Sequence, residues 1–151
     1  MKKPVVLLLI FASFALTGCG SEAEASAQLQ TYGESLLSYC DTINENQGNI
    51  NNMDVTSPDA SARFLEYIDN IDYAFSGIYN LEIPVGFEEL QIMANNGFTY
   101  MDTADMLYHE IYETGDYSAY NMDKDHEAYN NYVSAIECLN KMGNELLNKT
   151  N

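Results

Sequence analysis

The sequence is poor in basic residues, with six lysines and arginines against 23 aspartates and glutamates and a formal net charge of −17. Because contacts from lysine and arginine to phosphate carry most of the affinity for nucleic acid, this balance argues against a nucleic-acid-binding role. An anionic lipid surface should also repel the chain. The negative field would instead attract basic proteins or divalent cations.

Several motifs that would mark a chemical function are also missing. No Cys-x-x-Cys pair, Cys-x-x-Cys-His haem attachment, nucleophile elbow, glycine-rich nucleotide loop or Glu-x-x-His motif occurs. The run from Asn121 to Tyr132 begins like an EF-hand loop, but His126 stands where glycine is needed and Tyr132 where the bidentate glutamate belongs. We therefore predict that the protein is not an enzyme, and we predict no cofactor, bound metal or small-molecule substrate.

The N-terminus has the three parts of a secretory signal. Lys2 and Lys3 give a positive start, Val5 to Phe14 is apolar, and Leu16-Thr17-Gly18-Cys19 follows. The apolar run is shorter than the roughly 20 residues that a membrane span needs. Over residues 1–19 the chain resembles bacterial lipoproteins, whose lipobox reads Leu-x-Gly-Cys. The resemblance implies a diacylglycerol group on the Cys19 sulfur and cleavage between Gly18 and Cys19.

This resemblance predicts a lipid-anchored protein on the extracytoplasmic face of the cell membrane, or of the outer membrane in a Gram-negative source. We divide the chain into a signal peptide (1–18), a lipidated N-terminus with a tether (19–27) and a helical bundle domain (28–151). The small and polar residues 20–27 could equally prolong the first helix. Without residues 1–18 the formal charge becomes −19, because only Lys2 and Lys3 are lost.

Apolar residues repeat at spacings of three and four in four segments, which is typical of amphipathic helices. The first segment fades in the asparagine-rich stretch 44–52, and the second starts at Ser57, predicted as its N-cap, before Pro58. The third ends near Gly115, and the fourth begins near Asp123. No strand-like alternation of useful length appears. The pattern predicts an all-α fold, an antiparallel up-down-up-down four-helix bundle.

Two cysteines remain once Cys19 is set aside for lipid, namely Cys40 and Cys138. In such a bundle the first and fourth helices would be neighbours, and both cysteines would lie at a similar height. Export places them where disulfides form. We therefore predict a Cys40–Cys138 disulfide, the alternative being two small buried thiols.

Both histidines lie among acidic residues. Asp105, His109 and Glu113 share one helical face, since they are four residues apart. A second acidic group surrounds His126 at the start of the fourth segment. If the hairpin joined the two groups, carboxylate and imidazole ligands for a metal would meet. Both lie beside a helix end, however, where solvated polar residues are expected.

The chain has twelve tyrosines, and Tyr112, Tyr117 and Tyr120 crowd the link after the third helix. Tyrosine in a loop often anchors an interface, so this link is our candidate partner surface; alternatively, the rings cover the end of the bundle. The sequence favours a non-catalytic envelope lipoprotein that binds a partner, with a basic protein as the candidate, or that serves as an accessory or structural module. The alternative is an acidic domain that binds or sequesters divalent cations.

Overall fold

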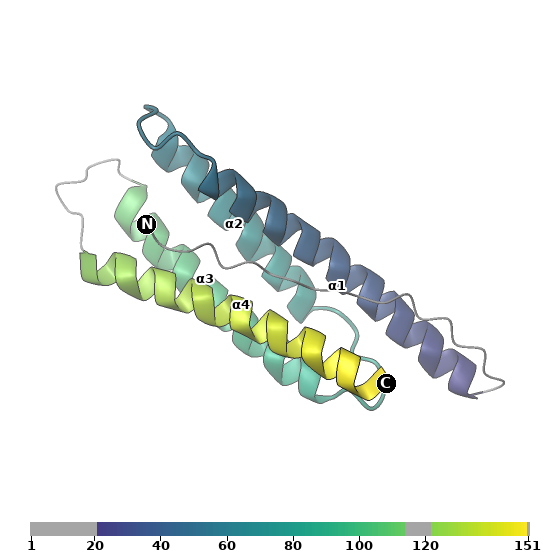
Figure 1. Ribbon diagram of the computed structural model, residues 1–151. Helices are drawn as coiled ribbons and strands as arrows, with labels where there is room; N and C mark the ends of the chain where they lie inside the picture. Colours follow the sequence, from purple (N-terminus) through teal and green to yellow (C-terminus); the bar gives the residue numbers. More distant parts are fainter. Residues whose placement is uncertain (1–20, 114–121, 151) are drawn as a thin grey trace.

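The computed structural model describes residues 21–113 and 122–150, and this part of the chain forms four helices and no strand. They are α1 (Ser21–Asn51), α2 (Ala60–Tyr79), α3 (Glu89–Tyr112) and α4 (Met122–Thr150). Figure 1 shows the four helices packed along one another, with the α1–α2 loop at one end and the α2–α3 loop at the other. The predicted all-α four-helix bundle is confirmed.

Helices that follow one another in the chain are also neighbours in space. Cα atoms approach within 8 Å between α1 and α2, between α2 and α3, and between α3 and α4. In the described residues, α1 and α4 have no such approach. The first and fourth helices therefore lie farther apart than the predicted disulfide requires.

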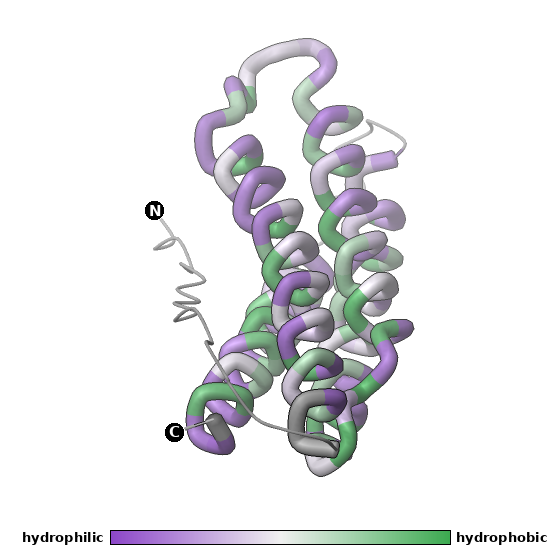
Figure 2. The backbone as a smooth tube through the Cα atoms, turned by 90° about the vertical axis from the view of Figure 1, so that its right-hand side faces the viewer, coloured by the Kyte–Doolittle hydropathy of each residue, from purple (hydrophilic) through white to green (hydrophobic). Residues whose placement is uncertain are grey.

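One continuous apolar core draws residues from all four helices. The positions that repeat at three and four residues supply it, and Figure 2 shows polar and apolar residues alternating along the helices. The largest side chains with almost no exposed surface are Leu36, Ile43, Ile68, Ile71, Phe75, Ile78, Leu90, Met101, Ile136, Leu139, Met142 and Leu146. Burial of an aliphatic or aromatic side chain contributes roughly 1.5–3 kcal/mol, so this core is the main source of stability.

The first helix is longer than its apolar pattern suggested. It starts at Ser21, so the segment that could have been a tether is helical from there, and it continues to Asn51. Asn46 explains the continuation, because its buried side chain donates a 2.8 Å hydrogen bond to the Thr42 carbonyl. Its Oδ1 accepts a bond from Asn70 of α2 at 3.3 Å. Polar residues are helix-compatible here because their side chains are satisfied.

The second helix begins later than predicted, and Ser57 is not its N-cap. Asp59 occupies that position, and its side chain makes no capping hydrogen bond. The Ser57 hydroxyl instead donates to the Asp59 carboxylate, and the Ser57 carbonyl accepts from the Ala60 N–H at 3.0 Å. A turn at Ser57 therefore precedes the helix, because the hydroxyl bonds a neighbouring carboxylate rather than a helical N–H.

Two glycines allow the helices to pack closely. A Cβ atom at Gly77 of α2 would lie 2.3 Å from the ring of Tyr39 in α1. A Cβ atom at Gly97 of α3 would lie 3.2 Å from the Phe75 ring and 3.3 Å from Cβ of Cys138. Glycine therefore sets the spacing of α2 against α1, and it fits tightly where α3 meets α2 and α4.

The predicted Cys40–Cys138 disulfide is wrong. Both cysteines are free and buried. A disulfide needs Cα atoms about 4.4–6.8 Å apart, and no described Cα atoms of α1 and α4 come within 8 Å. Burial raises the pKa of the Cys40 thiol to about 12 and also raises that of Cys138. Both thiols are thus inert core residues.

Candidate functional site

A groove lies at the end of the bundle where the α1–α2 loop meets the end of α3. It has a volume of about 720 Å³. Its lining residues are Val55, Thr56, Ser57, Pro58, Ser61, Ala62, Leu65, Glu66, Asp69, His109, Tyr112 and Glu113. An apolar depression of about 420 Å³ adjoins it and shares Val55, Ser61 and Tyr112. We call the two together the end groove.

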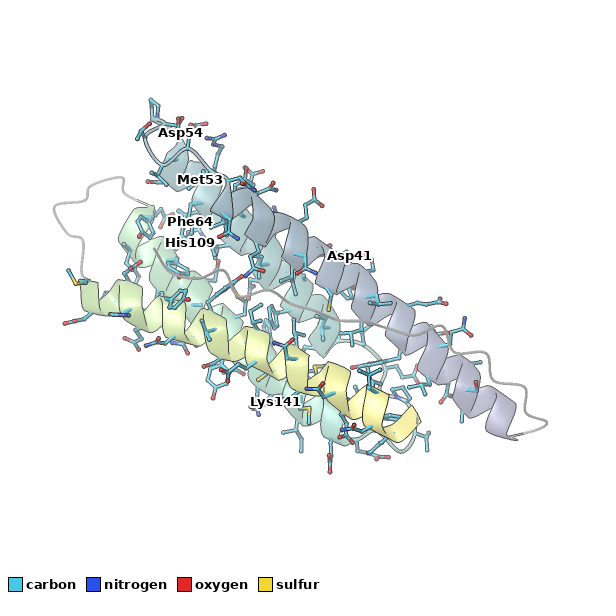
Figure 3. The ribbon with its side chains drawn as sticks, in the orientation of Figure 1. Asp41, Met53, Asp54, Phe64, His109 and Lys141 are labelled. Carbon is cyan, nitrogen blue, oxygen red and sulfur yellow. The ribbon has the colours of Figure 1, made fainter. Side chains whose placement is uncertain are left out.

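The apolar part of the end groove is built on packed aromatic rings. Phe64 of α2 contacts Tyr108 and Tyr112 of α3 edge-on, with ring centroids 5.0 and 5.3 Å apart. The Tyr112 hydroxyl donates to Asp125 Oδ1 of α4 at 3.1 Å. Figure 3 places Met53, Phe64 and His109 at this same end.

Tyr112, one of the predicted partner residues, therefore does two things. It joins α2, α3 and α4, as expected for a ring that covers the bundle end, and it also lines the end groove. The other two predicted residues, Tyr117 and Tyr120, lie outside the described residues, as does Cys19.

The polar part of the end groove leads to a cluster of Asp69 from α2 and of Asp105 and His109 from α3, which we call the Asp–His cluster. The Nε2 atom of His109 lies 2.7 Å from Asp69 Oδ1 and 3.8 Å from Asp105 Oδ1. One ligand atom from each residue lies within 4.8 Å of the others. Among the described residues, this is the one group of three or more such side chains with metal-binding spacing.

Two further carboxylates, Asp72 of α2 and Asp102 of α3, sit beside the Asp–His cluster. Burial, followed by repulsion from Asp105, Asp102 and Asp69, raises the pKa of Asp72 to about 6. Burial is also the main reason that the pKa of Asp105 rises to about 6, although His109 opposes the rise. The hydrogen bond to Asp69 raises the pKa of His109. The arrangement therefore favours uptake of positive charge, as protons or as a cation.

Sequence spacing identified part of this site and missed the rest. Asp105 and His109 lie four residues apart on one helix, as predicted, and the exposed Glu113 adds to their field. Asp69 was missed, because nothing in the sequence says which face of α2 packs beside α3.

The second predicted group does not join the cluster. No metal-spaced group within the described ranges includes a residue of α4. Asp125 accepts a hydrogen bond from Tyr112, and His126 is exposed.

The lining of the groove contains no lysine or arginine. The nearby Arg63 pairs with Asp59 at 3.3 Å, and Lys124 pairs with Glu110. Among the described residues that line the groove, His109 is therefore the one side chain that can carry positive charge.

Within the described ranges, no helix has the length and apolar character needed to cross a membrane. Carboxylate oxygens and an imidazole nitrogen can bind a cation, a proton or a basic side chain, and the apolar depression beside them can receive an apolar group. Comparison of the chain with protein-family models, with curated proteins and with solved structures gives no match.

Proposed function

We propose that this chain is a lipid-anchored lipoprotein of the bacterial envelope, with a helical domain that acts as a non-catalytic binding or accessory module. The observation that carries the proposal is the order of features at the N-terminus. A positive start, a short apolar run and Leu16-Thr17-Gly18-Cys19 follow one another as in bacterial lipoproteins. Two or more acyl chains at Cys19 would hold the domain stably at a membrane.

The position of the end groove agrees with this proposal. Helix α1 begins two residues after Cys19, and a helix of 31 residues is about 46 Å long. The α1–α2 loop that lines the groove follows the other end of this helix (Figure 1). A lipid anchor at Cys19 would therefore place the groove on the side away from the membrane, open to a partner.

The anchor is tested by replacing Cys19 with alanine in the cell and separating membrane from soluble fractions. We expect the wild type in the membrane fraction, labelled by a radioactive fatty acid, and the variant unlabelled and soluble. Cys40→Ala is the matched control and should stay in the membrane. Retention of the Cys19→Ala protein in the membrane fraction would overturn the lipid anchor.

Charge supports a basic protein as the partner, because Glu66, Asp69 and Glu113 line the groove without a lysine or arginine. The test is capture of envelope proteins by the full chain at low and high salt. Replacing Glu66 and Glu113 with lysine should abolish the salt-sensitive capture. Replacing Glu34 and Glu45 with lysine, an equal charge change at two exposed sites of α1 outside the groove, should leave capture intact. Equal capture by the groove variant and the control would refute this surface.

A second candidate function is divalent-cation binding by the acidic domain. The Asp–His cluster favours it, because two carboxylates and an imidazole from two helices converge within 4.8 Å. Isothermal titration calorimetry with Zn²⁺ and with Ca²⁺ tests it. The absence of heat from both cations at millimolar concentration would remove this candidate.

A further inference from the structure

We infer that Asp69, Asp105 and His109 form a site for one divalent transition-metal ion of the Zn²⁺ type, held between α2 and α3. The inference rests on the second candidate function, which it narrows to a location and a class of ion. It is independent of the lipid anchor and of the protein partner.

The spacing of the three ligand atoms suits a small ion. Zn²⁺ in a tetrahedral site binds nitrogen and oxygen at about 2.0–2.2 Å, which puts neighbouring ligand atoms about 3.3–3.5 Å apart. The His109 Nε2 atom lies 2.7 Å from Asp69 Oδ1 and 3.8 Å from Asp105 Oδ1, so the two distances bracket that value. Asp69 has a side chain that is 55% exposed and can move outward by the small distance required.

Two carboxylate oxygens, one in the cluster and one beside it, lack a hydrogen-bond partner. Asp105 Oδ1 and Asp72 Oδ1 are inaccessible to solvent and have no hydrogen-bond partner. A carboxylate oxygen of Asp105 also lies within 4.8 Å of one of Asp69. Two carboxyl groups at this spacing repel one another unless a proton or a cation lies between them. A metal ion would bind both, accept the lone pair of His109, and supply the missing partner of Asp105.

The choice of ligands separates the candidate ions. Ca²⁺ takes six to eight oxygen ligands and Mg²⁺ keeps several waters, and neither favours imidazole. Imidazole together with carboxylate suits Zn²⁺ and its transition-metal neighbours. Asp69 and His109 line the open end groove, so water can occupy the remaining coordination positions. Asp72 and Asp102 lie outside the three ligands and add negative charge that favours the bound ion.

The test is calorimetric titration of Zn²⁺ and, separately, Ca²⁺ into the full chain purified in detergent at pH 7.5. We expect one Zn²⁺ per chain and weaker binding of Ca²⁺. His109→Gln and Asp105→Asn should each weaken Zn²⁺ binding by about tenfold or more, since loss of a supporting group alone costs about 10–100-fold. The matched control His126→Gln replaces the other histidine, which is exposed among acidic residues of α4, and should bind Zn²⁺ like the wild type.

Circular dichroism shows whether each variant keeps its helices, and Asp69→Asn serves as a replacement for a variant that does not. Wild-type Zn²⁺ affinity in folded His109→Gln or Asp105→Asn would overturn the site while leaving diffuse cation binding by the acidic domain in place. Weakening by His126→Gln equal to that by His109→Gln would overturn it too. Absence of heat from both Zn²⁺ and Ca²⁺ would remove the site and the second candidate function together.

Discussion

Two rows of residues, which we call the apolar row and the acidic row, run side by side where α2 packs against α3. Each member of the acidic row directly follows a member of the apolar row in the sequence. Ile68 and Ile71 of α2 and Met101 and Ala104 of α3 are at most 2% exposed in the core. The residue after each of these four is an aspartate: Asp69, Asp72, Asp102 and Asp105. A rotation of about 100° per residue in a helix carries these aspartates from the core to its edge.

The two rows show that the same packing has opposite consequences for different chemistry. Contact between α2 and α3 removes the apolar row from water, which stabilises the fold. The same contact brings like charges together and partly desolvates two of them, which raises the pKa of Asp72 and Asp105. We therefore expect the apolar row to hold the bundle together and the acidic row to oppose it at neutral pH.

The largest effect should come from the apolar row. Ile71→Ala should lower the free energy of unfolding by about 2–5 kcal/mol, because the side chain is fully buried and leaves a cavity. Urea denaturation at pH 7.5 measures it. Tyr73→Ala is the control, because that side chain is 74% exposed, and it should change the free energy by less than about 0.5 kcal/mol. An equal decrease in the free energy of unfolding in both variants would mean that burial in the apolar row does not determine stability.

The acidic row should give the bundle an unusual pH dependence. Asp72 and Asp105 have folded pKa values of about 6, above the ordinary value of 3.8, so the folded state holds protons that the unfolded state releases. Stability should therefore rise as the pH falls through about 6. His109 acts in the same direction, because its raised pKa gives stability that is lost as the pH rises through its folded value.

We expect the free energy of unfolding to rise by about 1–2 kcal/mol as the pH is lowered from 7.5 to 4.5. This figure is already reduced for solvent screening, because neither Asp72 nor Asp105 is fully buried. Asp69, Asp102 and Glu113 add to the field that these groups feel. Urea denaturation with EDTA present measures the profile. Asp54, Asp59 and Glu88 have lowered pKa values, so their contributions should be lost only at more acidic pH. A free energy of unfolding that decreases steadily from pH 7.5 to pH 4.5 would contradict the expectation.

The apolar row could be predicted from the sequence, and the acidic row could not. Spacings of three and four place Ile68 and Ile71 on the apolar face of α2 and Met101 on that of α3, because burial depends on the residue type and its own helix. The meeting of Asp69 with His109 depends on which helices are neighbours and at what height, and no local pattern encodes that.

The cysteines show the same limit. Cys40 and Cys138 were correctly placed on helices and near the core, yet the predicted disulfide required α1 to lie beside α4. In the structure, close Cα approaches between helices follow chain order, and no described Cα atoms of those two helices lie within 8 Å of each other. The lipobox differs from both cases, since its signal is a contiguous run of residues and needs no fold to be recognised. It stays a prediction, because Cys19 lies outside the described residues.

A smaller effect should come from neutralising one member of the acidic row. Asp72→Asn keeps the shape of the side chain and removes a charge whose pKa burial has raised. We expect the free energy of unfolding to rise by about 1 kcal/mol at pH 7.5, less than for full burial because water screens a half-buried group. The gain should vanish below about pH 5, where the wild-type aspartate is protonated in the folded state. Asp41→Asn, at an exposed position of α1, is the matched control and should not change stability.

The smallest effect separates the two histidines. His109→Gln removes the 2.7 Å contact with Asp69, and an ion pair this exposed contributes about 0.2–1 kcal/mol. The loss should appear below about pH 6.5, where the unfolded histidine is also charged, and should fade as the pH rises. His126→Gln, at an exposed position, should leave the pH profile unchanged. The two histidines have equally acidic neighbours in the sequence. If the two variants had identical profiles of stability against pH, the acidic neighbours along each helix, and not the contact between α2 and α3, would determine how the histidines affect stability.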